Sequence, residues 1–160
     1  MSVCLDTNVL VWGVQKKATP NRVAMIERAE RFLTWLAGEK ETIVVPSVVL
    51  GEFLSGVPKS EHAGALSAFH DVFAVAPFDA AAAAIAANLW LDYKARQPTQ
   101  DAASAGPGRH VIKADCQIVA TAIASQASVL YSDDPDMAAL ANGRLRVEAI
   151  PSIPAQSVLL

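Results

Sequence analysis

The sequence has few of the residues that build disulfide frameworks or zinc sites. Only two of its 160 residues are Cys and three are His, and none of them stands at the spacing of paired zinc ligands. We therefore expect Cys4 and Cys116 to be small buried thiols and His62, His70 and His110 to lie on the surface. A redox centre or a zinc centre is not indicated.

Positive charge is also scarce. Thirteen Lys and Arg against sixteen Asp and Glu give a formal net charge of −3. This balance argues against tight, nonspecific binding to nucleic acid, which depends on a surplus of Lys and Arg. It does not exclude a nuclease, because an acidic site that holds metal ions can meet phosphate through the metal.

Long apolar runs are absent as well. The stretch 80–91 is apolar, but Asp79 and Asp92 bound it, and a membrane-spanning helix needs about 20 apolar residues. Met1 leads directly into an apolar, strand-like run without the charged region of a signal peptide, so we expect a cytoplasmic protein. With 52% hydrophobic and 18% charged residues, we expect residues 1–160 to form a single domain with a substantial core.

Short Val- and Ile-rich runs alternate with longer helical patterns, which is typical of an α/β fold with a parallel sheet. Strands are predicted at Ser2–Asp6, Thr42–Pro46, Phe73–Pro77, Ser128–Ser132 and Leu145–Ile150. Helices are predicted from about Asn21 to Gly38 and at Ser47–Ser55, Glu61–Asp71, Asp79–Arg96, Lys113–Ser125 and Asp136–Ala141. The segment Gln97–His110, rich in Pro, Gly and Ala, is predicted to be a long loop.

Carboxylates follow two of the predicted strands. Asp6 ends the first, while Asp133 and Asp134 end the fourth, and ligands bind at the carboxyl ends of strands in open parallel sheets. The alternative is helix capping, by Asp6 before Thr7 and by Asp134 before Pro135. The two roles are compatible.

Two further carboxylates are predicted to point inward from helices. Counting about 100° per residue, Glu52 falls between Val48 and Val49, and Asp115 falls in the apolar face of its own helix. A buried carboxylate needs a partner, and for Asp115 an ion pair with Lys113 or Arg109 is one alternative. A hard divalent cation such as Mg²⁺ or Mn²⁺ accounts for the whole set.

Four segments in order, "LDTNVL", "VPSVVLGEFL", "ADCQIVATA" and "LYSDD", together resemble the acidic motifs of the PIN-domain ribonucleases, most closely the VapC-type toxins of toxin–antitoxin pairs. The resemblance implies an α/β three-layer sandwich, with a central parallel sheet of four or five strands and helices on both faces. It implies that Mg²⁺ or Mn²⁺ is held by Asp6, Glu52, Asp115 and Asp134, with Asp133 as the alternative fourth ligand. Asn8 and Ser132 match polar positions that order the site.

The same resemblance implies a metal-dependent endoribonuclease. Metal ions at the site would lower the pKa of a bound water for in-line attack at phosphorus and stabilise charge on the phosphoryl oxygens. It also implies a VapB-like antitoxin whose C-terminal segment blocks the groove, and a homodimer. Candidate phosphate contacts, with a solvated face as the alternative, are Lys94, Arg96, Arg109, His110 and Lys113.

Two other readings compete with the ribonuclease. "LDTNV" also looks like the aspartyl-phosphate motif of haloacid-dehalogenase-like phosphatases, with Asp6 as nucleophile, although that family has a second Asp where Asn8 stands. The other alternative is a PIN-like module that binds RNA or a partner without cutting. Metal-dependent cleavage of RNA distinguishes the ribonuclease from both.

Overall fold

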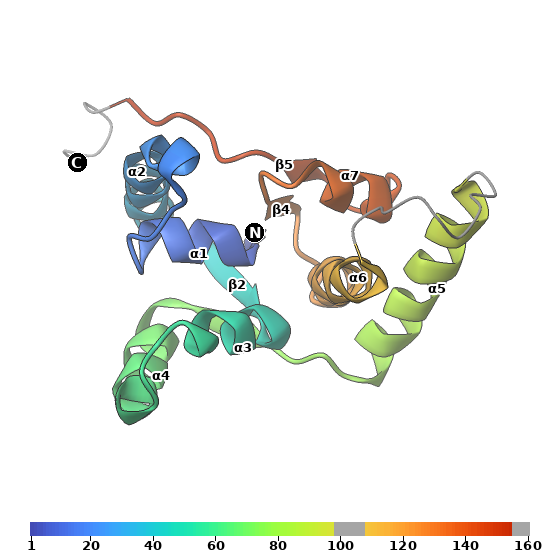
Figure 1. Cartoon of the computed structure of the whole chain (residues 1–160), viewed down its shortest axis with the longest axis horizontal. Coiled ribbons are helices and arrows are strands. Elements are labelled where there is room, and N and C mark those ends of the chain that lie inside the picture. Colours follow the sequence, from blue (N-terminus) through green and yellow to red (C-terminus); the bar gives the residue numbers. More distant parts are fainter. Residues whose placement is uncertain (98–107, 155–160) are drawn as a thin grey trace.

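A parallel five-stranded sheet with helices on both faces forms the centre of the protein (Figure 1). This computed structural model describes residues 1–97 and 108–154. The strands are β1 (Ser2–Leu5), β2 (Thr42–Pro46), β3 (Ala74–Ala76), β4 (Val129–Tyr131) and β5 (Val147–Glu148). They lie in the order β3-β2-β1-β4-β5, and every neighbouring pair is parallel. The predicted α/β class and sandwich architecture are confirmed.

The helices divide into two layers. They are α1 (Thr7–Gly13), α2 (Ala24–Gly38), α3 (Ser47–Ser55), α4 (His62–Val72), α5 (Ala80–Arg96), α6 (Arg109–Ala124) and α7 (Pro135–Ala141), with 3₁₀ turns η1 (Pro20–Arg22) and η2 (Lys59–Glu61). Figure 1 shows α1 to α4 on one side and α5 to α7 on the other. This follows from right-handed crossovers, because β1 to β3 progress toward one edge of the sheet whereas β4 and β5 lie toward the other.

The central strand is covered on both faces. Val3, Cys4 and Leu5 of β1 are all buried, as expected for a parallel strand between two helical layers. Phe32 of α2 is fully buried, and its ring meets Tyr131 of β4 edge to face with 4.6 Å between the ring centres. Both cysteines are buried free thiols, as predicted.

The predicted elements are all present, with differences at their ends. α6 begins at Arg109 rather than Lys113, so the prediction that the long loop extends to His110 is wrong. Residues 98–107 of that predicted loop lie outside the described part of the chain. The edge strand β5 is shorter than predicted and hydrogen-bonds to β4 alone.

The histidines lie on the surface in part. His70 and His110 are exposed as predicted, whereas His62 is half-buried with its Nε2 atom 2.9 Å from the carbonyl oxygen of Val57. Across residues 1–97 and 108–154, we find no helix that combines the length and the hydrophobicity of a bilayer-spanning segment.

Candidate functional site

Asp6 lies where β1 gives way to α1, next to the end of β4. The backbone N–H of Asp6 donates to the carbonyl of Tyr131 at 3.1 Å, which joins the two strand ends. Its side chain is only 4% exposed. Oδ1 accepts from the backbone N–H of Thr7 at 2.7 Å, so the predicted capping role is confirmed.

Ser132 connects two of the acidic segments. The Ser132 hydroxyl donates to Asp6 Oδ2 at 2.7 Å, and Ser132 Oγ accepts from the backbone N–H of Asp134 at 3.1 Å. Ser132 is itself buried, at 4% exposure. The serine therefore holds the Asp6 carboxylate and the backbone of Asp134 in a fixed relation.

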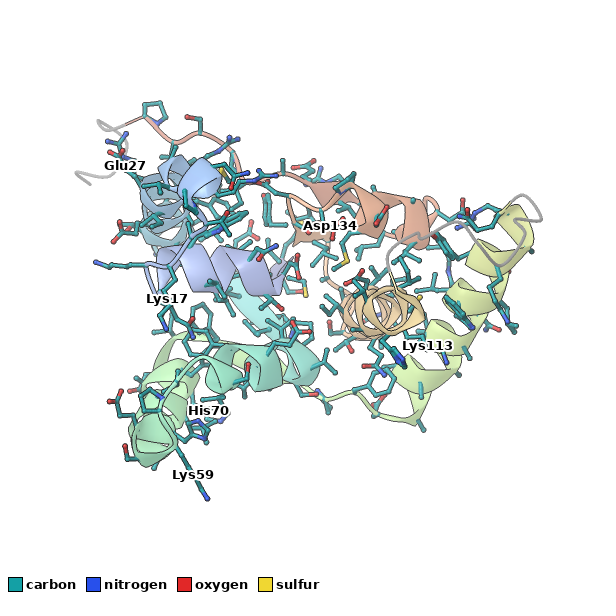
Figure 2. All side chains as sticks on the ribbon, viewed as in Figure 1. Lys17, Glu27, Lys59, His70, Lys113 and Asp134 are labelled. Atoms are coloured by element: carbon teal, nitrogen blue, oxygen red, sulfur yellow. The ribbon has the colours of Figure 1, made fainter. Side chains whose placement is uncertain are left out.

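The two aspartates after β4 accept different hydrogen bonds. Asp133 Oδ1 accepts from the backbone N–H of Ile150 at 3.1 Å, which ties it to the segment after β5. Asp134 caps α7 by accepting from the N–H of Asp136 at 2.9 Å, with Pro135 in the first helical position, as predicted. Figure 2 shows Asp134 at the end of α7 that faces α1.

Asp115 is buried in α6, as its position among apolar residues predicted. It is 8% exposed, and within the described chain its Oδ2 atom is buried without a hydrogen-bond partner. Among the described residues no ion pair joins Asp115 to Lys113, whose ammonium lies over the Trp90 ring at 5.6 Å from its centre. The side chain of Arg109 lies outside what the structure describes.

The prediction for Glu52 is wrong in one respect, because its side chain is exposed. The buried face of α3 consists of Val49, Leu50 and Phe53. At about 100° per residue, Glu52 lies roughly 100° from the centre of that face. Its carboxylate still reaches the first residue of α1, next to Asp6, because Oε2 accepts a hydrogen bond from the hydroxyl of Thr7.

The electrostatics show that these carboxylates act on one another. Burial raises the pKa of Asp6 to about 6; hydrogen bonds from Ser132 and Thr7 lower it, and the charges of Glu52 and Asp134 raise it. Burial also raises the pKa of Asp115 to about 7, and the charges of Asp134, Asp6, Glu52 and Asp136 raise it further. Of the two aspartates after β4, it is the charge of Asp134 that raises the pKa of both groups.

We tested whether this set of side chains suits a metal ion. Among residues 1–97 and 108–154, no three His, Cys, Asp or Glu side chains stand close enough together to hold one ion. The donor chemistry nevertheless fits a hard divalent cation, because every acidic side chain of the cluster offers carboxylate oxygens. The carboxyl groups of Asp6 and Asp115 have raised pKa values, and Asp115 Oδ2 is buried without a hydrogen-bond partner in the described chain. A cation would offset both the cost of burying these carboxylates and the repulsion between them.

Sequence reasoning missed two contributors. Thr7 orients Glu52, and Asp136 adds negative charge near Asp115. The signal for Asp136 was its place two residues after Asp134 in the first turn of α7, where acidic residues are favoured. The predicted site-ordering residue Asn8 is exposed, and no side-chain hydrogen bond of Asn8 is present among the described residues.

A pocket of about 640 Å³ adjoins the carboxylates. One wall carries Asn8 of α1 with Asp133, Asp134 and Pro135 of the β4–α7 junction. The remaining lining residues follow along and beyond α1 and are Val11, Trp12, Lys17, Ala18, Thr19 and Arg22. Asp134 is thus shared between the acidic cluster and the pocket.

Comparison with known proteins identifies relatives in fold and family. The family model for the PIN domain matches residues 3–143. The crystal structure of VapBC2 from Rickettsia felis bound to a DNA fragment from their promoter contains a chain that superposes with a TM-score of 0.66 at 20% sequence identity, covering 94% of this chain and 100% of that one. None of the curated proteins matches the sequence significantly.

Proposed function

The chain belongs to the PIN domain family, a family of nucleases, and we propose that it is a metal-dependent endoribonuclease. The observation that carries the proposal is the pair of buried carboxylates, Asp6 and Asp115, whose pKa values are raised by burial and by the other acidic side chains at the same sheet edge. Clustered, perturbed carboxylates of this kind are typical of functional sites. The membership sets aside the phosphatase alternative.

The proposed metal ligands are the predicted quartet of Asp6, Glu52, Asp115 and Asp134. Mg²⁺ or Mn²⁺ bound by them would activate water and stabilise the charge that develops on phosphate oxygens. Ser132 orders the quartet by fixing Asp6 against the Asp134 backbone, and Thr7 directs Glu52 toward it. Burial of Asp6 and Asp115 keeps water away from two of the ligands, which strengthens their interaction with a cation.

Cleavage of a mixed RNA pool tests this function directly. The wild type is expected to cut with Mg²⁺ or Mn²⁺ and to be inactive in EDTA, while Asp6→Asn and Asp115→Asn are expected to be inactive although folded. Asp71→Asn, an exposed carboxylate on α4, removes the same charge away from the site and should keep full activity. Cutting that persists in both site variants would refute the assignment.

The non-catalytic alternative is separated by the same assay. A module that only binds RNA or a partner would leave the RNA pool intact under every metal condition. Release of phosphate from a small phosphate ester, with phosphate trapped on Asp6, would instead favour the phosphatase alternative.

We further propose that the protein is the toxin of a toxin–antitoxin pair, with a VapB-like antitoxin and a homodimeric state. The shared fold with a VapBC2 chain supports this proposal. Expression of the wild type alone is expected to arrest growth, expression of Asp6→Asn is not, and a small protein should co-purify from its native host. A monomeric mass in light scattering would contradict the homodimer, and the cytoplasmic location stays a prediction.

A further inference from the structure

The pocket beside the carboxylates is lined by charges of both signs that form no ion pair with one another in the described part of the chain. Lys17 and Arg22 line it together with Asp133 and Asp134. The ion pairs among the described residues are Lys16–Glu30, Arg31–Glu27 and Arg146–Glu148, and none of them involves a lining residue of the pocket. The two cations therefore retain their capacity to bind an anion from outside.

The backbone that carries these cations is fixed. The side-chain amide of Gln15 donates to the carbonyl of Phe53 at 2.8 Å, and the Lys17 ammonium donates to the carbonyl of Gly56 at 3.1 Å. Both contacts anchor the segment after α1 to the end of α3. The N–H of Arg22 donates to the carbonyl of Thr19 at 2.8 Å within η1.

The contact of Lys17 leaves donors for a ligand. An ammonium group has three N–H donors, and the bond to Gly56 uses one of them. Arg22 is exposed, and neither a side-chain hydrogen bond nor an ion pair engages its guanidinium in the described chain. Lys17 and Arg22 both line the pocket, and a guanidinium together with an ammonium suits a phosphate, which accepts from both.

The position of the cations along α1 decides which phosphate they meet. Asn8 and Asp134 lie at the start of α1, whereas Lys17 and Arg22 lie beyond its end. The seven residues of α1 rise about 10 Å at 1.5 Å per residue. Cations at this distance from the carboxylates would meet a different phosphate of a bound strand. Figure 2 shows the labelled residues Lys17 and Asp134 toward opposite ends of α1.

We propose that this pocket binds a nucleotide of the RNA substrate that flanks the scissile bond, with Lys17 and Arg22 holding its phosphate. The inference rests on the proposed ribonuclease function. The volume of about 640 Å³ falls within the range of roughly 300–1,000 Å³ common for ligand sites. Val11 and the buried Trp12 add apolar side chains to the lining, which can contact the faces of a base or ribose.

The test measures RNA binding separately from RNA cutting. A short fluorescein-labelled single-stranded RNA of mixed sequence is titrated with Asp115→Asn protein in EDTA, and anisotropy gives Kd over a series of salt concentrations. The same titration is made after adding Lys17→Gln with Arg22→Gln. The matched control adds Lys16→Gln with Arg31→Gln, which removes the same two charges from surface ion pairs outside the pocket.

The pocket variant is expected to bind about tenfold or more weakly than the control, since hydrogen bonds to charged groups are lost. The slope of log Kd against log salt should decrease by about 1.4, at about 0.7 for each single-strand phosphate contact removed. Arg22→Gln alone should reduce the slope by about 0.7, and this variant leaves the Lys17 contact with Gly56 intact.

Each outcome has one meaning. Equal affinity and salt slope in the pocket and control variants would overturn the pocket while leaving the ribonuclease untouched, provided that the wild type cuts RNA. Wild-type protein that does not cut RNA, together with the expected pocket-dependent binding, would refute the ribonuclease and the flanking of a scissile bond, and would support the pocket only as a site that binds RNA. Absence of RNA binding, or a loss confined to binding of a partner protein, would overturn the assignment of the pocket to RNA.

Discussion

Replacing Asp115 by Asn is expected to stabilise the protein at mildly alkaline pH in the absence of divalent metal. Moving the pKa of this carboxyl from its ordinary 3.8 to about 7 corresponds to roughly 4 kcal/mol of unfavourable free energy once the group is ionised, at about 1.4 kcal/mol per pH unit. Local relaxation reduces the penalty, so we expect the free energy of unfolding to rise by about 2–4 kcal/mol at about pH 8. The amide keeps the shape of the side chain and offers a donor to the surrounding carboxylates.

The stabilisation by Asp115→Asn should depend on pH. Between about pH 4 and pH 7 the folded carboxyl keeps a proton that the unfolded chain has released, so the stability of the wild type falls as pH rises. The advantage of Asp115→Asn should therefore be small near pH 4, grow up to about pH 7, and stay constant above about pH 8.

Urea unfolding followed by circular dichroism, in EDTA and across this pH range, measures the effect. Asp71→Asn, which neutralises an exposed carboxylate, should change the free energy of unfolding by less than about 0.5 kcal/mol at every pH. If Asp115→Asn is no more stable than the wild type at high pH, or if its advantage does not vary with pH, the electrostatic reasoning is refuted. A stabilised but inactive Asp115→Asn would also exclude unfolding as the cause of lost RNA cleavage.

Three further outcomes are expected. Mg²⁺ or Mn²⁺ should raise the melting temperature of the wild type in calorimetry, and should no longer do so in a variant with both Asp6→Asn and Asp115→Asn; an equal rise in both proteins would place the metal elsewhere. Ser132→Ala should lower the free energy of unfolding at about pH 8 by about 1–3 kcal/mol, because it removes the donor to Asp6 Oδ2, while Ser132→Thr should retain most of it. Phe32→Ala should lower the free energy of unfolding by about 3–5 kcal/mol in urea, because it empties a fully buried site against Tyr131; a loss below about 1 kcal/mol would contradict the packing described.

The order of strands and helices could be predicted because local patterns and the sheet agree. Thr42–Pro46 and Ser47–Ser55 were predicted to the residue, since a β-branched run meets a helical pattern at Pro46. The ends of the other strands are harder to predict from the sequence. Pro77 after β3 has no N–H to donate, and β5 hydrogen-bonds to one neighbour, so both are shorter than their apolar runs.

The acidic cluster shows where a helical projection is sufficient and where it fails. Asp115 falls at the centre of the face that contains Ile118, Val119 and Ala122, and it is buried as predicted. α3 is apolar on more than one side, and Val48 is only half-buried, so the projection gave no reliable centre for the face on which Glu52 was placed. Asp133 accepts from the N–H of Ile150, a contact across 17 positions that local pattern does not reveal.

The arrangement of the strands also limits when the acidic cluster can exist. β1 precedes the other four strands in the sequence but lies in the middle of the sheet, and its neighbour β4 follows more than a hundred positions later. Asp6 obtains the Ser132 hydroxyl and the charge of Asp134 only after β4 has paired with β1. A stretch of chain that lacks β4 and the residues after it can hold Asp6, Glu52 and Asp115, but not the serine that fixes Asp6. The acidic cluster is therefore complete only when segments more than a hundred positions apart have met.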